Sequence, residues 1–301
     1  MKQYNKRFTV FTPTYNRGHL LETVYRSLQR QTFRDFEWLV IDDGSADNTL
    51  ELLEQWSREE NFFSIVYCGV QNGGKHRAIN HALSMAQGEL FFILDSDDKL
   101  TDTALEVADR VEKTIPENQK EFFCGICGLR GTSEDTALGT TFSGKMYLDI
   151  THIERDNYTM DGDKAEVYYT EVIKKYPFPA FSGENFLLES VVWERMAWDG
   201  YKIRYFNEII YLCEYLPDGL TKNSAQILTR NPKGYALSIR QRIAFGILRG
   251  RKKWDAKWQY YNLLKSSLTL KEIADNLGMS QIGLLSGLFA LKIYSKICCK
   301  H

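Results

Sequence analysis

The most informative segment of the chain is Phe91-Phe92-Ile93-Leu94-Asp95-Ser96-Asp97-Asp98. Its four large apolar residues in a row predict a strand that is buried on both faces, as in a sheet covered by helices. Three carboxylates follow within four residues, and they repel one another while ionised. A divalent cation such as Mg²⁺ or Mn²⁺ relieves this repulsion and prefers oxygen ligands. The segment therefore predicts a metal site at Asp95, Asp97 and Asp98, with an ordinary solvated turn as the alternative.

The residues before this segment alternate between short β-rich runs and amphipathic helical runs. Strands are expected at residues 8–12, 36–41, 63–67 and 90–94. Helices are expected between them, at residues 19–31, 47–58 and 75–87. Alternation of this kind is typical of βαβ units, which build a parallel sheet. We therefore predict an α/β fold with a Rossmann-like, mostly parallel central sheet flanked by helices.

Three polar loops follow these strands, at residues 12–17, 42–45 and 95–98. We expect them to meet at one edge of the sheet, because ligands of open α/β sheets bind beyond the carboxyl ends of the strands. A nucleoside diphosphate fits this edge, since Tyr15 can stack on a base and Asp43 can accept a hydrogen bond from a base N–H. Lys75 begins a helix beside two glycines and can contact a phosphate. Each residue also has an ordinary alternative role, in core packing, in a turn or as a solvated lysine.

The motifs in these loops are similar to those of the family 2 glycosyltransferases, which have the GT-A fold. They read Thr12-Pro13-Thr14-Tyr15-Asn16-Arg17, Val40-Ile41-Asp42-Asp43-Gly44-Ser45 and Gly88-Glu89-Leu90 followed by residues 91–98. The resemblance implies an inverting transferase that uses a nucleotide-sugar donor and Mn²⁺ or Mg²⁺. The implied nucleotide-binding residues are Thr12, Pro13, Tyr15, Arg17, Asp43, Lys75 and Ser96. The implied metal ligands come from Asp95, Asp97 and Asp98, and which of the three contacts the metal directly stays open.

The resemblance also implies a catalytic base. In the family, an acidic residue six positions before a helical arginine supplies it, and Glu189 stands in this relation to Arg195. The chain lacks the usual Glu-Asp pair, so Glu184 is a rival for the same role. The alternative for Glu189 is a glutamate that stabilises the N-terminus of a helix.

The second half of the chain is less regular. A helix is expected at 101–115, a strand at 122–130 and a further strand at 207–215, whereas the polar residues 132–163 predict loops that shape an acceptor site. The loop 216–223 is expected to close on the donor. We predict a GT-A catalytic domain at 1–228, with a nucleotide-sugar half at 1–100 and an acceptor half at 101–228. A helical C-terminal region at 229–301 would follow it.

This C-terminal region is strongly basic. Residues 229–301 contain 14 Lys and Arg against 3 Asp and Glu, a net charge of +11, whereas residues 1–228 carry −12. Aromatic residues interleave with the basic ones at Trp254, Trp258, Tyr260 and Tyr261. Because such a mixture is typical of membrane interfaces, we predict that 229–301 binds an anionic membrane surface. The alternative is a helical domain that packs on the core and leaves a solvated basic face.

Residues 268–280 resemble a helix-turn-helix, which would suggest DNA binding. The second helix would begin with Gln281-Ile282-Gly283-Leu284-Leu285, which offers few hydrogen-bonding groups to base edges. We therefore expect no nucleic-acid partner. A Cys124-x-x-Cys127 pair without a second pair predicts reduced thiols rather than a zinc site.

The N-terminus leads into the first strand without a signal peptide, and no apolar run approaches the roughly 20 residues that span a bilayer. We expect a cytoplasmic enzyme, peripheral on the inner face of the membrane. It would transfer one sugar, with a UDP-sugar favoured as donor, to a glycan or lipid-linked acceptor in the biosynthesis of a cell-surface polysaccharide such as a capsule. The alternative enzyme is a metal-dependent nucleotidyltransferase or phosphohydrolase that uses the same Asp cluster. The donor sugar, the acceptor, the linkage and the oligomeric state stay open.

Overall fold

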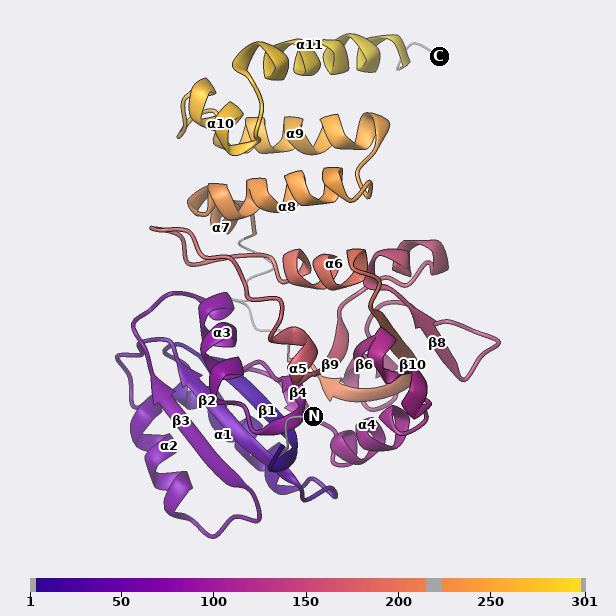
Figure 1. Ribbon diagram of the computed structural model, residues 1–301. Coiled ribbons are helices and arrows are strands. Elements are labelled where there is room, and N and C mark those ends of the chain that lie inside the picture. The colour runs from indigo at the N-terminus through magenta and orange to yellow at the C-terminus, as the bar shows by residue number, and fades with distance from the viewer. Residues whose placement is uncertain (1–3, 215–223, 299–301) are drawn as a thin grey trace. The chain divides into compact units, whose positions relative to one another are not determined.

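The computed structural model describes residues 4–214 and 224–298 (Figure 1). It divides into two compact units. The first, which we call the sheet unit, consists of Met1–Phe178 and Arg195–Tyr215. The second, which we call the helical unit, consists of Pro179–Glu194 and Leu216–His301.

The sheet unit is built on one sheet of ten strands. Eight of them follow the order β3-β2-β1-β4-β9-β6-β10-β5, and the other two, β7 and β8, pair with β6 and β10. Neighbours within β3-β2-β1-β4 are parallel, as are β6 and β10, whereas β9 is antiparallel to both β4 and β6. The strands are β1 (Lys6–Thr14), β2 (Phe36–Asp42), β3 (Ser64–Gly69), β4 (Gly88–Ile93), β5 (Lys99–Leu100), β6 (Phe123–Ser133), β7 (Thr136–Ala137), β8 (Tyr147–Ile150), β9 (Lys164–Tyr169) and β10 (Lys202–Leu212). The predicted α/β fold with a central sheet flanked by helices is confirmed, but the sheet is mixed: among the described residues four strand pairings are parallel and five are antiparallel.

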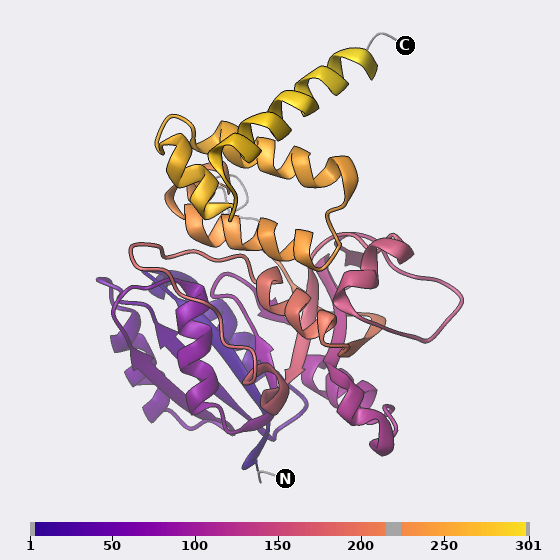
Figure 2. The ribbon, with the colours of Figure 1, turned by 45° about the horizontal axis from the view of Figure 1, so that its top comes forward.

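Helices cover both faces of the parallel half of this sheet (Figures 1 and 2). The strand order reverses between β1 and β4, so the crossover from β3 returns past β2 and β1. Because crossovers are right-handed, α1 and α2 lie on one face and α3 on the other. The helices of the sheet unit are α1 (Gly18–Gln29), α2 (Thr49–Arg58), α3 (Lys75–Met85), α4 (Ala104–Glu112) and α5 (Thr170–Ile173), with 3₁₀ turns η1 (Glu117–Phe122) and η2 (His152–Tyr158). The helix α6 (Ser190–Trp198) has its first residues in the helical unit and its last in the sheet unit.

The strand predicted from residues 91–94 is the centre of the core. Phe91 and Phe92 are both fully buried, although successive residues of a strand point to opposite faces of the sheet. Every residue of β2, which lies on the other side of β1, is buried as well. Both faces of the sheet are therefore covered, as the apolar run predicted.

The second half of the sheet unit differs from the sequence-based prediction in its details. Residues 132–163, predicted as loops, contain β7, β8 and η2. The strand predicted at 207–215 corresponds to β10, which starts earlier, at Lys202, and ends at Leu212. The two cysteines predicted to be reduced thiols, Cys124 and Cys127, are buried in β6. Burial raises the pKa of Cys124 to about 12.

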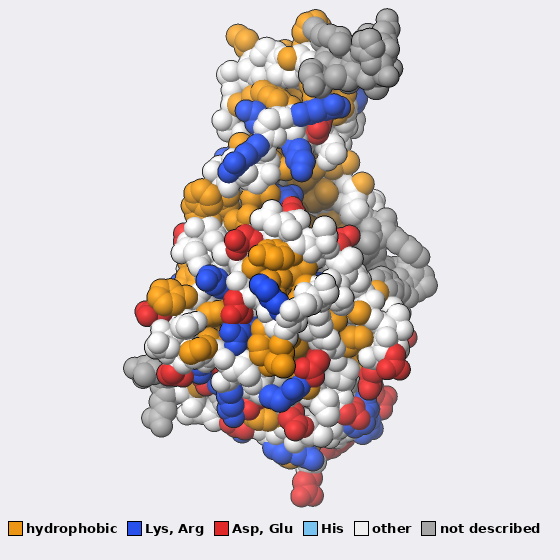
Figure 3. Space-filling model, turned by 90° about the vertical axis from the view of Figure 1, so that its right-hand side faces the viewer, with side chains coloured by type: hydrophobic (Ala, Val, Ile, Leu, Met, Phe, Trp, Pro, Cys, Tyr) orange, Lys and Arg blue, Asp and Glu red, His pale blue; other side chains and the backbone are white. Residues whose placement is uncertain are grey.

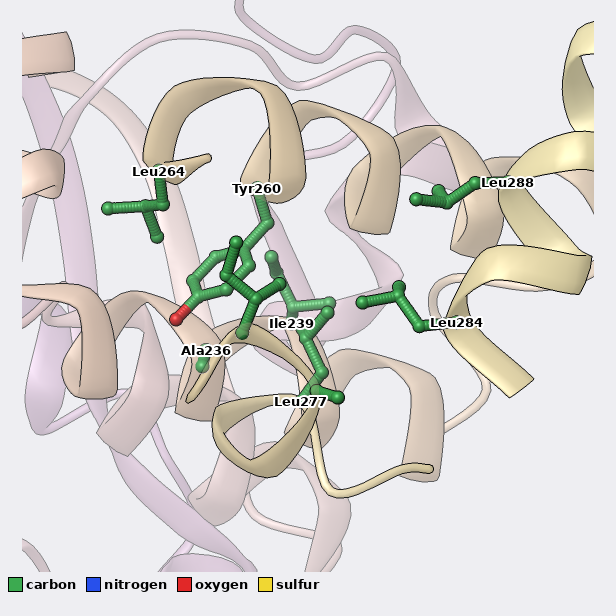
Figure 4. Close-up of a cluster of buried hydrophobic side chains, with 9 residues drawn as sticks. Ala236, Ile239, Tyr260, Leu264, Leu277, Leu284 and Leu288 are labelled. Atoms are coloured by element: carbon green, nitrogen blue, oxygen red, sulfur yellow. The ribbon is translucent and has the colours of Figure 1, made fainter. Parts of the chain in front are cut away.

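The helical unit contains α7 (Ser224–Arg230), α8 (Pro232–Ala244), α9 (Gly250–Leu264), α10 (Leu270–Asn276) and α11 (Gln281–Cys298). These helices enclose a core of their own, in which Ile239 of α8, Tyr260 of α9 and Leu284 of α11 point toward a common interior (Figure 4). The Tyr260 hydroxyl donates a hydrogen bond to the carbonyl oxygen of Pro232 at 3.0 Å and accepts one from Asn276 Nδ2 at 3.0 Å. Its polar end is therefore satisfied although the ring is buried.

None of the helices within 4–214 and 224–298 combines the length and the apolar character that a membrane-spanning segment requires. The helix-turn-helix resemblance corresponds to α10 and α11, which are two separate helices. The exposed face of α11 carries the apolar side chains of Ile282, Leu285 and Phe289. Such side chains offer no hydrogen bonds to base edges.

Candidate active site

The three polar loops lie side by side at the carboxyl edge of the parallel strands. Thr14 at the end of β1 pairs with Asp42 at the end of β2. The amide of Asp43 donates to the carbonyl oxygen of Thr14 at 2.8 Å, and the amide of Leu94 donates to the carbonyl oxygen of Phe11 at 2.8 Å. The loops after β1 and β4 therefore flank the point where the strand order reverses, which is where open α/β sheets bind ligands.

The loop after β1 is fixed by hydrogen bonds to the loop after β2. Asn16 adopts a left-handed conformation with φ of 53°, which asparagine tolerates better than most residues. Its amide donates to Ser45 Oγ at 2.7 Å, and its Oδ1 accepts from the amide of Ala46 at 2.7 Å. This arrangement leaves the neighbouring Tyr15 side chain 49% exposed, so its ring is accessible for stacking on a base.

Asp43 is buried and receives two backbone hydrogen bonds from the turn before α3. Its Oδ1 accepts from the amide of Gly73 at 2.8 Å, and its Oδ2 accepts from that of Gly74 at 2.7 Å. Burial raises the pKa of Asp43, although these two amides act in the opposite direction. Since a carboxylate oxygen has two lone pairs, each oxygen can still accept one more donor, such as a base N–H.

Two of the residues predicted to bind the nucleotide, Thr12 and Ser96, are buried. Thr12 is fully buried, and its Oγ1 accepts a hydrogen bond from Trp38 Nε1 at 3.0 Å. Ser96, which lies between Asp95 and Asp97 in the sequence, is also buried. Thr14, which the sequence analysis did not single out, has a buried hydroxyl that finds no hydrogen-bond partner among the described residues. Pro13 next to it is partly exposed.

The carboxylates after β4 are held by basic residues from other loops. Asp95 Oδ1 forms an ion pair with Lys75 Nζ at 2.6 Å, and Asp97 Oδ2 forms one with an Arg17 guanidinium nitrogen at 2.5 Å. Asp98 is held differently, because its Oδ2 accepts from the Tyr211 hydroxyl at 2.7 Å and its Oδ1 from the amide of Glu214 at 3.0 Å. The structure thus brings together the predicted acidic cluster and the two predicted cations.

Burial and charge act in opposite directions on these acids. Burial disfavours ionisation of Asp95, but Lys75 and Arg130 outweigh it and hold the pKa of Asp95 below its usual range. For Asp98, burial together with the charge of Asp95 raises the pKa to about 6, although Tyr211 acts in the opposite direction. The three carboxylates face three cations, Arg17, Lys75 and Arg130, so their charge is balanced by residues of the chain itself.

The donor chemistry of the cluster fits a divalent metal ion. Carboxylate oxygens are the ligands that Mg²⁺ and Mn²⁺ prefer. In residues 4–214 and 224–298, however, no group of three or more His, Cys, Asp or Glu side chains is arranged as a ready-made metal site. Metal binding would require Arg17 and Lys75 to exchange their carboxylate partners for other anions.

Arg130 and Tyr211 belong to the site but were missed by the sequence analysis. Arg130, near the end of β6, lies 3.8 Å from Asp95 Oδ2, and its guanidinium stacks 4.1 Å from the centroid of the Tyr211 ring. Both residues lie in strands that were predicted, at 122–130 and 207–215. Only the pairing of these strands through β9 brings them next to β4, and no local sequence signal specifies that pairing.

The two candidate bases lie in the helical unit. Glu189 directly precedes α6, where its carbonyl oxygen accepts from the amides of Val192 at 2.9 Å and Trp193 at 3.3 Å. Glu184 is buried, and its carboxylate accepts two backbone hydrogen bonds from the first turn of α8. Glu184 thus caps a helix, which is the role that the alternative interpretation had offered for Glu189. The predicted donor-closing loop 216–223 lies outside the described residues.

A comparison with protein families finds one match in this part of the chain. The family model described as Glycosyl transferase family 2 matches residues 9–174, which include the three loops. A curated relative is GalNAc(5)-diNAcBac-PP-undecaprenol beta-1,3-glucosyltransferase from Campylobacter jejuni, 30% identical over 173 residues that make up 56% of this chain and 52% of the relative. The chain spans at most about half the length of the curated relatives that it matches.

Solved structures show the same fold at low sequence identity. Staphylococcus aureus TarS 1-349 in complex with UDP-GlcNAc has a TM-score of 0.59 at 15% identity, over 96% of this chain and 91% of that one. Mannosyltransferase PcManGT from Pyrobaculum calidifontis, in complex with GDP-Man and Mn²⁺, has a TM-score of 0.54 at 18% identity, over 97% of this chain and 81% of that one. These likenesses confirm the predicted GT-A fold.

Proposed function

Because the chain belongs to glycosyl transferase family 2, we propose that it transfers one sugar from a nucleotide-sugar to an acceptor hydroxyl with inversion at the sugar. The observation that carries this proposal is the acidic cluster Asp95, Asp97 and Asp98 at the point where the strand order reverses, surrounded by Arg17, Lys75 and Arg130. Carboxylates and cations at one edge of a sheet suit a metal-bound diphosphate. A UDP-sugar is the favoured donor, since the structural neighbour TarS binds UDP-GlcNAc.

In this proposal, each loop contacts a different part of the donor. Tyr15 stacks on the base. Asp43 accepts a hydrogen bond from a base N–H through carboxylate lone pairs that the amides of Gly73 and Gly74 do not use. Asp97, together with Asp95 or Asp98, would hold Mn²⁺ or Mg²⁺, which would neutralise charge on the departing diphosphate. Lys75 and Arg17 then turn from the aspartates toward phosphate oxygens.

Glu189 is the proposed general base. It takes the proton of the acceptor hydroxyl while the hydroxyl oxygen attacks the anomeric carbon of the sugar. The bond from that carbon to the diphosphate oxygen breaks in the same step, so the configuration inverts and a nucleoside diphosphate leaves. In this proposal residues 1–228 form the catalytic region, and residues 229–301 form a helical region that shares a compact unit with residues 179–194.

A thermal-shift screen of nucleotide-sugars with and without Mn²⁺ tests donor binding. A ligand that binds the folded state alone stabilises it by about 2.7 kcal/mol at roughly 100 times its Kd. We expect a UDP-sugar with Mn²⁺ to raise the melting temperature, and excess chelator to remove most of the increase. Failure of every nucleotide-sugar to raise it, with or without metal, would contradict the proposal.

The acceptor is proposed to be a glycan or a lipid-linked sugar at the inner face of a membrane. The name of the Campylobacter jejuni relative describes an undecaprenol-linked acceptor, which supports this class. The helical unit supplies a surface for the membrane, because Ile282, Leu285 and Phe289 of α11 are 80%, 48% and 66% exposed. The face of these helices visible in Figure 3 shows Lys and Arg beside hydrophobic side chains and little acidic surface.

The aromatic residues predicted to contact the membrane contribute less than expected. Tyr260 is fully buried in the core of the helical unit, and Trp254 packs against Gly287 of α11. Trp258 remains exposed and stacks on Tyr261 with ring centroids 6.0 Å apart. The membrane proposal therefore rests on the exposed residues of α11 and on the net charge of the region.

Phe289→Glu is expected to weaken binding to vesicles that contain anionic lipid by about tenfold or more, because burying a phenylalanine side chain contributes roughly 1.5–3 kcal/mol. The measurement is sedimentation with vesicles at two salt concentrations, and binding of the unmodified chain should decrease as salt increases. Phe122→Glu is the matched control, since Phe122 is 56% exposed but belongs to the sheet unit. Equal binding to neutral and anionic vesicles, or equal loss in both variants, would contradict the proposal.

A further inference from the structure

Residues 184–191, which include Glu189 and which we call the segment, are attached to the helix α8 by hydrogen bonds in both directions. The first turn of any helix has backbone N–H groups without intrahelical partners, which the side chain of the N-cap residue usually satisfies. In α8 the N-cap residue is Asn231, but its side chain makes no capping bond. Glu184 takes over this role, accepting from the amides of Lys233 and Gly234 at 2.8 Å each.

Asn231 in turn accepts hydrogen bonds from the segment. Its Oδ1 lies 2.8 Å from the amide nitrogen of Asn185 and 2.9 Å from that of Phe186. Its Nδ2 donates to the carbonyl oxygen of Ile227 at 2.7 Å, which fixes the orientation of the amide. The side chains of Glu184 and Asn231 are 7% and 2% exposed, so these bonds form away from solvent and are costly to break.

Close packing and a second anchor complete the attachment. A Cβ atom at Gly234 would lie 3.1 Å from the Phe186 carbonyl oxygen, so glycine allows the segment to approach the helix closely. Further along α8, Gln241 Nε2 donates to the carbonyl oxygen of Val191 at 2.9 Å. Two side chains of this part of the chain therefore hold the segment on either side of Glu189: Asn231 bonds to Phe186 before it, and Gln241 bonds to Val191 after it.

We propose that Asn231 and Gln241 are positioning residues for sugar transfer, which hold the segment around Glu189 in its working conformation. This inference rests on the proposed function of Glu189. Catalytic groups must be held to within about 0.5 Å, and a displacement of about 1 Å can cost roughly 10²-fold in rate.

Asn231→Ser provides the first test. Serine is a favoured N-cap residue, so α8 should persist, but its side chain is too short to replace the bonds to the segment. We expect the turnover of transfer to fall by about 10-fold or more, with unchanged affinity for the nucleotide-sugar, because a misplaced base affects the chemical step. Gln241→Met, which removes the second anchor with little change in volume, should act in the same direction. Tyr260→Phe is the control, since it removes the hydrogen bonds of the hydroxyl to Pro232 at the start of α8 and to Asn276, neither of which involves the segment.

A double variant separates positioning from general structural damage. In a Glu189→Gln background, Asn231→Ser should cause almost no further loss of turnover, because the group that it positions is already gone. Equal losses in both backgrounds, or an unchanged turnover in Asn231→Ser and Gln241→Met, would overturn the inference. If Glu189→Gln alone transfers at the normal rate, the assignment of the base fails instead, so the two failures are distinguishable.

Discussion

Replacing Asp97 by asparagine is expected to lower transferase turnover by about 10²-fold or more. The substitution removes one negative charge from the proposed metal ligands, and a bound metal contributes several kcal/mol of charge stabilisation as the diphosphate leaves. The fold should persist, because Asp97 and its partner Arg17 are both partly exposed and asparagine can still accept a hydrogen bond from the guanidinium. Turnover as a function of Mn²⁺ concentration measures the effect, together with the melting temperature.

Asp102→Asn is a matched control for this substitution. Asp102 is also an aspartate paired with an arginine, Arg30 at 2.9 Å, but the pair is exposed and makes no contact with the cluster. We expect Asp102→Asn to leave turnover nearly unchanged, in line with the small contribution of exposed ion pairs. Full activity of the unmodified chain in excess chelator would contradict the metal assignment, as would normal activity of Asp97→Asn.

Glu189→Gln should lower turnover by about 10²-fold while the affinity for the nucleotide-sugar stays unchanged. General-base assistance contributes roughly 10²–10⁴-fold, and glutamine cannot take the proton of the acceptor hydroxyl. The melting temperature should change little, since glutamine retains the size of the side chain and its polar oxygen. Transfer kinetics at saturating donor, combined with a direct binding measurement, separates the two effects.

Glu184→Gln gives a contrasting result if the assignment is right. Its carboxylate accepts two amides of α8, and glutamine offers a single acceptor oxygen for them. We expect a lower melting temperature and a smaller loss of turnover than in Glu189→Gln. Near-normal transfer by Glu189→Gln together with an inactive but folded Glu184→Gln would identify Glu184 as the base. If both variants are active, the acidic residues of 132–163 become the next candidates.

The parallel half of the fold could be predicted because its signals are local. Each strand of β1 to β4 is a compact apolar run, each helix shows its own periodicity, and each loop follows directly from its strand. The loops around Tyr15, Asp43 and Asp97 were therefore placed at one edge without knowledge of the pairing. The same local patterns carried the resemblance to glycosyl transferase family 2.

The rest of the site depends on contacts between distant parts of the chain. Lys164–Tyr169 contains charged residues at two of its six positions, so its role as an inner strand was not evident. Without β9, the sequence could not place Arg130 and Tyr211 next to Asp95. Burial of the predicted nucleotide contact Thr12 also depends on a distant residue, because its hydroxyl accepts a hydrogen bond from Trp38.

The capping role of Glu184 was hidden for the same reason. Its partners lie 49 and 50 residues further along the chain, beyond the reach of any capping pattern in the sequence. From the sequence, Glu189 was favoured as the base by its spacing to Arg195, and Glu184 remained a rival. The contacts with α8 give the carboxylate of Glu184 a structural role at the start of that helix.

The most direct test of the proposed activity is to identify the products formed from a UDP-sugar in the presence of Mn²⁺. The proposed reaction breaks the bond between the anomeric carbon and the diphosphate. It predicts that UDP accumulates in equal amount with sugar transferred to an acceptor or, slowly, to water, and that NMR shows the inverted anomer. Release of pyrophosphate or of a sugar phosphate would instead indicate cleavage at phosphorus, as in a nucleotidyltransferase or phosphohydrolase, and would contradict the assignment of this chain as a glycosyltransferase.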